Sequence, residues 1–371
     1  MKIGLVLESD LAKPGGVQEY VRGLYDHLEP AGHRVDILTA GGQGAGTSAR
    51  SVIRLGKSVD MPIPGTSAST PLIRVNARAI TRRLEQGRYD ILHFQGPGGT
   101  FNSRILKLSR AINIITFHVH HAGIIPGLAG LLWPWERRLN DKYARKIAVS
   151  PPAASFAARL CPGSYDVIPN GVDLDRFHPG LPENQEPGDE PVNILFVGRL
   201  DRRKGLTYLL SAYKLLNPTP KKRLLIVGDG PEKRSAERYV RRHKLQEVHF
   251  LGPVTRNRLP DIYRSADIFC APATHGESFG IVLLEALATG LPVVAFANPG
   301  YRDVLNSPPL CDFLVSPKDI PGLSHKIQTL ARDENLRRRL GRAGLEHVRR
   351  YSWDRVGARI VKLYEEELGS A

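Results

Sequence analysis

An α/β fold with two Rossmann-like domains is the fold class that this sequence predicts, and three observations predict it. Short aliphatic segments alternate with amphipathic segments along the chain, which is the pattern of βαβ units and a parallel sheet. The alternation stops once, at a segment rich in proline, glycine and acidic residues, and then begins again. A length of 371 residues suits two domains, and a hydrophobic content of 42% gives each of them a core.

The first half of the chain, residues 1–177, is expected to form an N-terminal domain around one parallel sheet. Its candidate strands share runs of β-branched or aliphatic residues. They are Ile3–Leu7, Arg34–Leu38, Ile91–Phe94, Ile112–Phe117, Lys146–Val149 and Val167–Pro169.

Residues 178–191 are interpreted as the domain linker, and residues 192–352 as the C-terminal domain. The pattern of the first half recurs there. The candidate strands are Asn193–Val197, Arg223–Val227, Val248–Leu251, Ile268–Ala271 and Val293–Phe296. Residues 353–371 begin with an amphipathic stretch that predicts a final helix.

Composition limits the classes of partner and the cellular compartment but does not identify the function. The chain has 52 basic and 37 acidic residues, a net charge of +15, which favours nucleic acid, anionic lipid or phosphorylated ligands as partners. Its three cysteines lie far apart and show no metal-ligand spacing, which fits a reducing compartment. No apolar signal run precedes the first strand and no run of eighteen apolar residues occurs, so we expect no membrane span.

The most informative motif places two glutamates around the start of a helix. An apolar helix is expected from Ile281, so Glu277 lies in the entering loop and Glu285 in the second turn. Eight residues of helical rise would span about 12 Å, the scale of a folded nucleotide sugar. The N–H groups that can bind hydroxyls or a diphosphate belong to Phe279, Gly280, Ile281 and Val282. The alternative is that Glu277 complements the helix dipole and Glu285 is a solvated helix residue.

Two cations, Arg199 and Lys204, follow the first strand of the second half. Ligands of doubly wound folds bind at the carboxyl ends of strands. A guanidinium forks onto phosphate oxygens and an ammonium adds a point charge, so the two can stabilise a departing nucleoside diphosphate. The alternative is a solvated basic loop. Val254, which follows another strand, is a candidate for backbone contact with the nucleobase.

The first half offers its own candidates at strand ends. Gly15 and Gly16 let backbone N–H groups approach a diphosphate closely, although a simple turn also explains them. Asp10 and Gln18, on either side of these glycines, are candidates for the acceptor site. His118 follows the strand Ile112–Phe117, where its imidazole can bind a sugar hydroxyl.

Metal binding is not expected. His120 and His121 lie near His118, but no cysteine or acidic cluster joins them. Asp173 and Asp175 have the spacing of an Asp-x-Asp metal motif, yet they lie in a turn after a strand, where a structural role is favoured.

A cationic amphipathic helix is expected in the first half, where arginines recur at four-residue spacing. It would place Arg74, Arg78, Arg82 and Arg83 against an anionic membrane surface. The segment Trp133–Trp135 could add interfacial aromatic rings. The alternative is a solvated basic face.

Taken in order, these segments resemble the family 4 retaining glycosyltransferases of the GT-B fold. The segments are Gly15–Val17, Thr116–His118, Pro169–Asp173, Val197–Arg199, Lys204–Gly205 and Glu277–Glu285. Their order and spacing cover nearly the whole chain. The phosphatidylinositol mannosyltransferases are the most similar, on the segments Pro14–Gln18, Thr116–His118, Ile168–Asp173, Arg264–Asp267 and Gly276–Leu283.

The resemblance implies roles for particular residues. Arg199 and Lys204 would hold the diphosphate, Glu277 and His118 the transferred hexose, Glu285 the ribose, and the backbone of Gly16 the phosphates. It also implies that the final helix crosses back onto the N-terminal domain. The family pattern favours front-face displacement, in which the leaving phosphate accepts the proton of the acceptor.

We therefore expect transfer of a hexose from a nucleotide sugar, GDP-mannose favoured, to phosphatidylinositol or a related phospholipid. We expect no metal or other cofactor, no nucleic-acid partner, and a cytoplasmic protein held peripherally on the inner face of the plasma membrane. The loop Ile63–Ser69 lacks the Tyr-Asn pair that follows Ile-Pro in the inositol-lipid enzymes. The alternatives are a UDP-sugar donor with a diacylglycerol or soluble acceptor, a GT-B nucleotide-sugar epimerase, and a polyanion-binding protein without activity.

Overall fold

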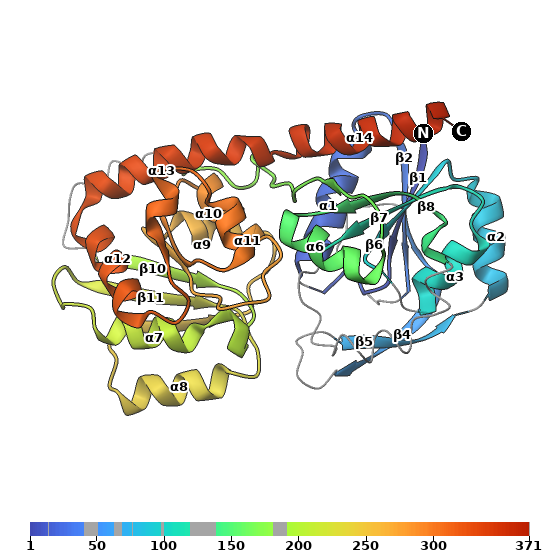
Figure 1. Ribbon diagram of the computed structural model, residues 1–371. Helices are drawn as coiled ribbons and strands as arrows, with labels where there is room; N and C mark the ends of the chain where they lie inside the picture. The colour runs from blue at the N-terminus through green and yellow to red at the C-terminus, as the bar shows by residue number, and fades with distance from the viewer. Residues whose placement is uncertain are drawn as a thin grey trace. The chain divides into compact units, whose positions relative to one another are not determined.

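The computed structural model describes residues 1–13, 15–40, 51–62, 69–75, 77–97, 100–118, 139–180 and 191–370, with side chains for all of these except 57–62 and 69–75. The chain divides into two compact units (Figure 1). Unit 1 comprises Met1–Gly171 and Trp353–Ala371, and unit 2 comprises Val172–Ser352.

The boundary between the units lies at Gly171, earlier than the end of the N-terminal domain expected at residue 177. The residues in between already pack within unit 2. The N–H of Val172 donates to the carbonyl of Tyr351 at 2.8 Å, and the ring of Phe177 packs edge-on against Tyr263 at a centroid distance of 5.7 Å. These long-range contacts have no local sequence signal.

Unit 1 is built on a seven-stranded parallel sheet of order β3-β2-β1-β6-β7-β8-β9. Its strands are β1 (Lys2–Leu7), β2 (Arg34–Thr39), β3 (Val52–Arg54), β6 (Ile91–Gln95), β7 (Ile112–Phe117), β8 (Tyr143–Ala148) and β9 (Asp166–Val167). The strands expected from the sequence are all present, and β3 is an addition. Its three residues form too short a run for the sequence pattern to identify.

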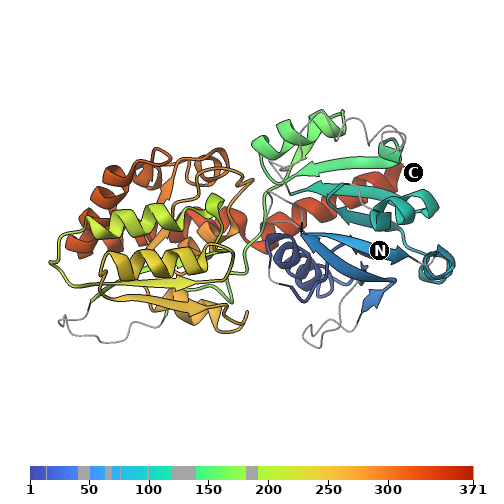
Figure 2. The ribbon, with the colours of Figure 1, turned by 90° about the horizontal axis from the view of Figure 1, so that it is seen from below.

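Helices cover both faces of this sheet, as the two views show (Figures 1 and 2). One face carries α1 (Gly16–Leu28) and α14 (Trp353–Ser370), which share a core with Ile3, Leu5 and Leu7 of β1. The other face carries α2 (Ala77–Gly87), α3 (Thr100–Leu108) and α6 (Pro151–Leu160), which pack over Val6. The alternation along β1 is the two-residue period of a strand buried on both sides.

The C-terminal helix α14 is tied to unit 1 by ring contacts and by a buried polar network. The ring of Trp353 lies against Gly23 and Gly171, where an added Cβ atom would come within 2.0 Å and 2.5 Å of it. The hydroxyl of Tyr364 lies 2.6 Å from Nδ1 of His93 on β6. Burial lowers the pKa of His93 to about 3, so this imidazole is neutral and the contact is an uncharged hydrogen bond.

A β-hairpin interrupts the expected helix of unit 1. Strands β4 (Gly56–Pro62) and β5 (Ser69–Val75) pair antiparallel, with Lys57 opposite Arg74. The prediction that Arg74 begins a cationic helix is therefore wrong, because α2 begins only at Ala77. The β-branched residues Ile73 and Val75 flank Arg74 and favour a strand.

Unit 2 is built on a six-stranded parallel sheet of order β12-β11-β10-β13-β14-β15. Its strands are β10 (Val192–Val197), β11 (Lys222–Val227), β12 (Val248–Gly252), β13 (Ile268–Ala271), β14 (Val293–Phe296) and β15 (Leu314–Val315). The first five match the strands expected from the sequence, and β15, with two residues, was not expected.

The helices of unit 2 form two further layers. On one face, α7 (Leu206–Lys214), α8 (Lys233–Arg242) and α12 (Ile320–Arg332) share a core with β10 and β11. The others are α9 (Leu259–Arg264), α10 (Ile281–Ala288), α11 (Pro299–Val304) and α13 (Glu334–Val348), with the short 3-10 turns η1 (Arg202–Lys204), η2 (Leu310–Phe313) and η3 (Arg349–Tyr351). Figure 1 shows α10 and α13 on the opposite side of the sheet from α7 and α8.

The predicted α/β fold with two Rossmann-like parallel sheets is confirmed. In each sheet the strand order reverses beside the first strand, between β1 and β6 in unit 1 and between β10 and β13 in unit 2. Doubly wound folds bind ligands at the carboxyl ends of strands around such a reversal. Within the described part of the chain, no helix is long and apolar enough to cross a membrane.

We expect Trp353→Ala to lower the free energy of unfolding by about 3–5 kcal/mol, because it leaves a cavity between α1 and α14. Chemical denaturation followed by circular dichroism measures this change. Leu251→Ala is the control, since Leu251 is 44% exposed and its truncation should change stability by less than about 0.5 kcal/mol. Equal effects of the two substitutions would show that the ring of Trp353 does not hold α14 in place.

Candidate functional site

The candidate donor site of unit 2 is formed by loops at the carboxyl edge of its sheet. The loop after β10 runs from Gly198 to Gly205, and the loop after β13 runs from Pro272 to Gly280. The two strands are neighbours, which brings the loops together. The N–H of Thr274 donates to the carbonyl of Arg203 at 2.9 Å and joins the loops through their backbones.

The loop after β10 is ordered by one aspartate and one glycine. Oδ1 of Asp201 accepts the N–H of Lys204 at 3.2 Å and caps η1, while its Oδ2 lies 3.6 Å from Arg203 and 3.9 Å from Arg199. Gly205 has a φ of 72°, and an added Cβ atom would lie 2.0 Å from the carbonyl oxygen of Pro272. Only glycine fits this close backbone crossing.

Glu277 is the centre of the site, because two cations of the neighbouring loop converge on it. Its Oε1 lies 2.9 Å from Nζ of Lys204 and 3.4 Å from Nη1 of Arg203. The same Nη1 also donates to the carbonyl of Gly276 at 2.9 Å. The side chains of Glu277 and Lys204 are only 9% and 17% exposed, so their charges interact in a partly desolvated setting. Arg199 differs, since its side chain is 53% exposed and available to an incoming anion.

Helix α10 begins at Ile281, as the sequence predicts, and Gly280 is its N-cap with a φ of 107°. Helical geometry leaves the N–H groups of Ile281 and Val282 without acceptors inside the helix. The side chain of Phe279, in contrast, is in the core and packs edge-on against Tyr351 at 5.6 Å. A contact from Phe279 to a donor would therefore use its backbone.

Glu285 lies in the second turn of α10 and is 5% exposed. Its Oε2 accepts the hydroxyl proton of Tyr263 at 2.8 Å. Burial and this carboxylate raise the pKa of Tyr263 well above its usual value, so the phenol remains a donor. The alternative that Glu285 is a solvated helix residue is wrong, because α9 and α10 pack together around it.

The first turn of α11, with its N-cap Asn298, supports the glutamate loop. Nδ2 of Asn298 donates to the carbonyl of Ala273 at 2.9 Å, and its Oδ1 accepts the N–H of Tyr301 at 3.0 Å. An added Cβ atom at Gly300 would lie 2.4 Å from the carbonyl oxygen of Glu277. The backbone of Glu277 thus rests directly on this turn.

Turns after β11 and β12 complete the same edge of the sheet. Added Cβ atoms at Gly228 and Gly230 would lie 2.0 Å and 2.5 Å from the carbonyl oxygens of Gly198 and Leu200. This close packing gives the Gly-Asp-Gly segment a structural role. Val254 follows β12 and is partly exposed, as a backbone contact to a nucleobase requires.

Asp173 has a structural role, as the sequence favoured. Its Oδ1 accepts the N–H groups of Asp175 and Arg176 at 3.1 Å and 3.0 Å, which closes a turn. In the part of the chain that the structure describes, no group of three or more His, Cys, Asp or Glu side chains could hold a metal ion. His120 and His121 lie outside the described residues.

In unit 1, His118 lies at the carboxyl end of β7 and is held from two sides. Its Nε2 lies 2.9 Å from Oε1 of Gln95, and its ring packs edge-on against Tyr20 at 4.7 Å. Because the Gln95 amide nitrogen donates to the carbonyl of His93 at 3.4 Å, its oxygen faces the imidazole, and Nε2 must carry the proton. Burial lowers the pKa of His118 to about 3, so the ring is neutral and Nδ1 is left as an acceptor.

The glycines before α1 have different surroundings. An added Cβ atom at Gly15 would meet Oε1 of Gln18 at 2.3 Å, whereas at Gly16 no atom of the described residues lies within 4 Å of such a position. Gly16 is thus the more accessible of the two. Asp10 and Gln18 lie together, since Nε2 of Gln18 donates to Oγ of Ser9 at 3.1 Å and to the carbonyl of Asp10 at 3.4 Å.

The basic helix α2 presents fewer free cations than the sequence predicts. Arg78 and Arg82 are exposed, but Nη2 of Arg83 pairs with Oδ2 of Asp36 at 2.8 Å. The hydroxyl of Tyr89 donates to the same carboxylate oxygen at 2.7 Å. The expectation that Arg83 faces a membrane is therefore wrong, because this arginine binds β2. The segments Ile63–Ala68 and Trp133–Trp135 lie outside the described residues.

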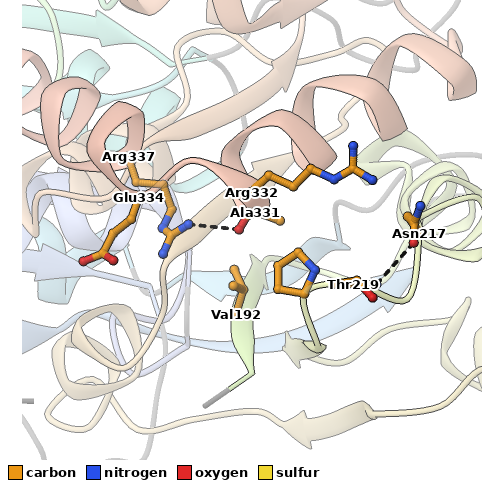
Figure 3. A pocket seen from close by; sticks show the side chains of 8 residues that line it. Val192, Asn217, Thr219, Ala331, Arg332, Glu334 and Arg337 are labelled. Carbon is orange, nitrogen blue, oxygen red and sulfur yellow. Dashed lines mark hydrogen bonds between the residues drawn. The ribbon is translucent and has the colours of Figure 1, made fainter. Parts of the chain in front are cut away.

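A pocket of about 590 Å³ lies at the other edge of the sheet of unit 2 (Figure 3). It is lined by Val192, Asn217, Thr219, Pro220, Ala331, Arg332, Glu334 and Arg337. Val192 begins β10, so the pocket lies at the amino ends of the strands and apart from the donor loops. Nη1 of Arg337 donates to the carbonyl of Ala331 at 3.2 Å, which ties α13 to the end of α12.

Three supporting residues of the site were not expected. Arg203 is adjacent to Lys204, and the run of basic residues could have identified it. Asn298 precedes a Pro-Gly pair, which signals a turn but not the loop that the turn supports. Tyr263 carries no local signal, because only the packing of α9 on α10 brings it to Glu285.

Comparisons with known proteins agree with this geometry. Residues 14–176 match the family model for Glycosyltransferase Family 4, and residues 181–347 match that for Glycosyl transferases group 1. The solved structure of sucrose-phosphate synthase from Thermosynechococcus elongatus is similar over the whole of both chains, with a TM-score of 0.75 and 23% identity. This likeness concerns the fold.

Two curated relatives are similar over nearly the full length. The phosphatidyl-myo-inositol mannosyltransferase of Mycobacterium leprae is 32% identical over 372 residues, covering 98% of this chain and 96% of the relative. The D-inositol 3-phosphate glycosyltransferase of Corynebacterium jeikeium is 29% identical over 388 residues, covering 95% and 92%. With this sequence identity, these family matches and two Rossmann-like sheets, the chain belongs to the family 4 glycosyltransferases of the GT-B fold.

Proposed function

We propose that this glycosyltransferase moves a hexose, mannose favoured, from a nucleoside diphosphate sugar to phosphatidylinositol or a related membrane phospholipid, with retention of configuration. GDP-mannose is the favoured donor. The observation that carries the proposal is the convergence of Arg203 and Lys204 on Glu277 at the carboxyl edge of the sheet, with the exposed Arg199 in the same loop. The name of the Mycobacterium leprae relative supports the choice of sugar and acceptor.

The cations of this cluster suit a diphosphate leaving group. Nζ of Lys204 has three donors and uses one on Glu277 at 2.9 Å, so it can bind a phosphate oxygen at the same time. The exposed guanidinium of Arg199 can add a forked contact. Charges fixed in place before the reaction stabilise negative charge that develops on the phosphate as the glycosidic bond breaks.

The two glutamates then take different parts of the donor. The Glu277 carboxylate, held by Lys204 and Arg203, would accept hydrogen bonds from hexose hydroxyls. The Glu285 carboxylate would accept from the ribose, because a carboxylate can accept further bonds beside the one from Tyr263. N–H groups of Ile281 and Val282 at the start of α10 would bind phosphate oxygens.

We further propose a front-face displacement without a metal. The acceptor hydroxyl attacks the anomeric carbon on the face that the diphosphate leaves, and a phosphate oxygen takes the proton. Arg199, Lys204 and the helix N–H groups supply the positive charge that a divalent ion supplies in other transferases. Charge stabilisation and positioning then account for the rate.

In unit 1 the neutral imidazole of His118 would bind the transferred sugar through Nδ1. Gly16 would let the N-terminus of α1 approach a phosphate, and Asp10 and Gln18 would border the acceptor. The exposed arginines Arg78 and Arg82 would attract α2 to an anionic membrane surface, which is consistent with a peripheral position on the inner face of the plasma membrane.

A second candidate function has a soluble acceptor. The Corynebacterium jeikeium relative is named for D-inositol 3-phosphate, which is a water-soluble phosphorylated inositol. A UDP-sugar donor with diacylglycerol as acceptor remains a third combination.

We expect mannose transfer from GDP-mannose to detergent-dispersed phosphatidylinositol, with an α-linked product and undiminished turnover after exhaustive chelation. Transfer assays with GDP-mannose, UDP-glucose and UDP-N-acetylglucosamine, each against phosphatidylinositol, diacylglycerol and inositol 3-phosphate, measure this choice. Transfer to inositol 3-phosphate alone would replace the lipid acceptor with the soluble one. A requirement for magnesium or manganese would contradict the metal-free mechanism.

Arg199→Ala and Lys204→Ala are each expected to lower turnover by about a hundredfold, the usual effect of removing one preorganised contact to developing charge. Steady-state kinetics at saturating donor measure the change. Arg202→Ala is the matched control, because Arg202 is exposed in the same loop and should leave turnover within about twofold. Near wild-type turnover in folded Arg199 and Lys204 variants would refute the roles assigned to them.

Replacing Arg78 and Arg82 together with glutamine is expected to weaken binding to anionic vesicles by about 25-fold, since each basic residue near such a surface contributes roughly fivefold. Vesicle co-sedimentation at low salt measures the affinity. Arg83→Gln should instead leave vesicle binding unchanged and lower stability, because it removes the cationic partner of Asp36, whose side chain is only 14% exposed. The reverse pattern would mean that Arg83, and not the exposed pair, faces the membrane.

A further inference from the structure

We propose that helix α8 of unit 2 is a second contact surface for an anionic lipid bilayer, made by Arg234, Arg238, Arg241 and Arg242. These four residues are called the arginine stripe below. The proposal goes beyond the transfer reaction, because it concerns how the unit that carries the donor loops is held at a membrane. It depends on none of the roles assigned to residues of the donor site.

The arginine stripe lies on one side of α8. At 100° of rotation per residue, the four arginines fall within a single stripe opposite Ala236, Tyr239 and Val240. Ala236 is 4% exposed, and Tyr239 and Val240 pack against the core of unit 2, whereas all four arginines are exposed. Figures 1 and 2 show α8 beside α7 on one side of the sheet.

Packing against α7 fixes this orientation. Oγ of Ser211 on α7 lies 3.1 Å from the hydroxyl of Tyr239 on α8. The Tyr239 ring also contacts the tilted ring of His243 at a centroid distance of 4.3 Å. Since α8 is anchored by its inner residues, its arginines point away from the protein.

The arginine stripe keeps its charge with respect to the described part of the chain. Among the residues that the structure describes, no carboxylate forms an ion pair with any of the four, and Glu237 on the same helix is included in that statement. Two exposed arginines elsewhere in unit 2 do find partners three or four residues away in the sequence. Arg338 pairs with Glu334 at 2.6 Å, and Arg349 pairs with Glu346 at 3.2 Å.

Neighbouring residues extend the positive surface beyond the helix. Nζ of Lys214, at the end of α7, lies 3.1 Å from Nδ1 of His243, and the exposed Lys244 follows. Burial, and then the charges of Lys214 and Arg242, lower the pKa of His243. His243 is thus neutral at pH 7 and does not offset the field of the arginines.

The shape and composition of this surface favour a bilayer as the partner. Ten helical residues span about 15 Å, so the partner must present several anions over that length. Leu215, which follows Lys214, is 58% exposed and can enter the interfacial layer of a membrane. Single-stranded nucleic acid would instead use exposed aromatic rings for stacking, but the ring of Tyr239 is turned inward onto α7.

The test compares two variants with the same loss of charge in unit 2. The first replaces the arginine stripe with four glutamines. The control replaces Arg338, Arg339, Arg342 and Arg349, which are also exposed, with four glutamines. Binding to vesicles of phosphatidylglycerol and phosphatidylcholine, and to phosphatidylcholine alone, is measured in low salt and in high salt.

We expect the stripe variant to bind the anionic vesicles on the order of 600-fold more weakly than wild type, because each of the four basic residues contributes roughly fivefold. The control variant should lose much less, and high salt should abolish the difference between them. Transfer to a detergent-dispersed acceptor should be unchanged in both variants, which separates this proposal from the proposed function.

Three results would overturn the inference. In the first, the stripe variant binds anionic vesicles as tightly as wild type. In the second, it loses no more affinity for these vesicles than the control variant does. In the third, it keeps vesicle binding and loses binding to a single-stranded oligonucleotide. The last result would assign the arginine stripe to nucleic acid. If the variant with Arg78 and Arg82 replaced also loses vesicle binding, both units contact the membrane. If that variant loses vesicle binding and the stripe variant does not, the membrane contact belongs to unit 1 alone.

Discussion

The ion pair between Lys204 and Glu277 is the interaction on which the donor site depends. It joins the loop after β10 to the loop after β13, at the point where the strand order of the sheet reverses. Both side chains are mostly buried, and removal of one partner from such a pair typically costs about 3–5 kcal/mol. Arg203 reinforces the pair by binding the Glu277 side chain and the Gly276 carbonyl together. The ammonium of Lys204 and the carboxylate of Glu277 therefore position each other without a ligand.

Close backbone packing makes this pair possible. Gly205 crosses the carbonyl of Pro272, and Gly300 crosses that of Glu277, each at a distance that a side chain would not permit. The glycines bring the two loops near enough for short ion pairs. Asn298 holds the loop after β13 through its hydrogen bond to the carbonyl of Ala273. Unit 1 uses a different device, in which a hydrogen bond to Gln95 sets the proton on His118 and burial keeps the imidazole neutral. Unit 2 thus offers side chains with fixed charges. Unit 1 offers a neutral imidazole that can accept a hydrogen bond.

The sequence predicted the strands and the helix around Glu277 and Glu285, because long apolar runs bounded by glycine carry a strong local signal. It did not predict the hairpin of β4 and β5, where Arg74 fitted a four-residue period but lies on a strand. It also missed the pairing of Arg83 with Asp36, since a periodic pattern reports which side of a helix a residue occupies but not which partner it meets. The roles of Tyr263 and Asn298 were not predicted for the same reason. Their roles arise from contacts between elements that are distant in sequence.

The return of α14 makes unit 1 discontinuous in sequence, and this has a consequence for biosynthesis. A ribosome releases β1 to β9 early, then the whole of unit 2, and only at the end the helix that supplies Trp353, Ile360 and Tyr364 to the first core. Unit 2 can thus complete its fold while unit 1 still exposes the apolar side of α1 and β1. During that interval the nascent first unit exposes apolar surface. Premature termination within residues 353–370 would therefore damage the core of the amino-terminal unit, although unit 2 is already complete.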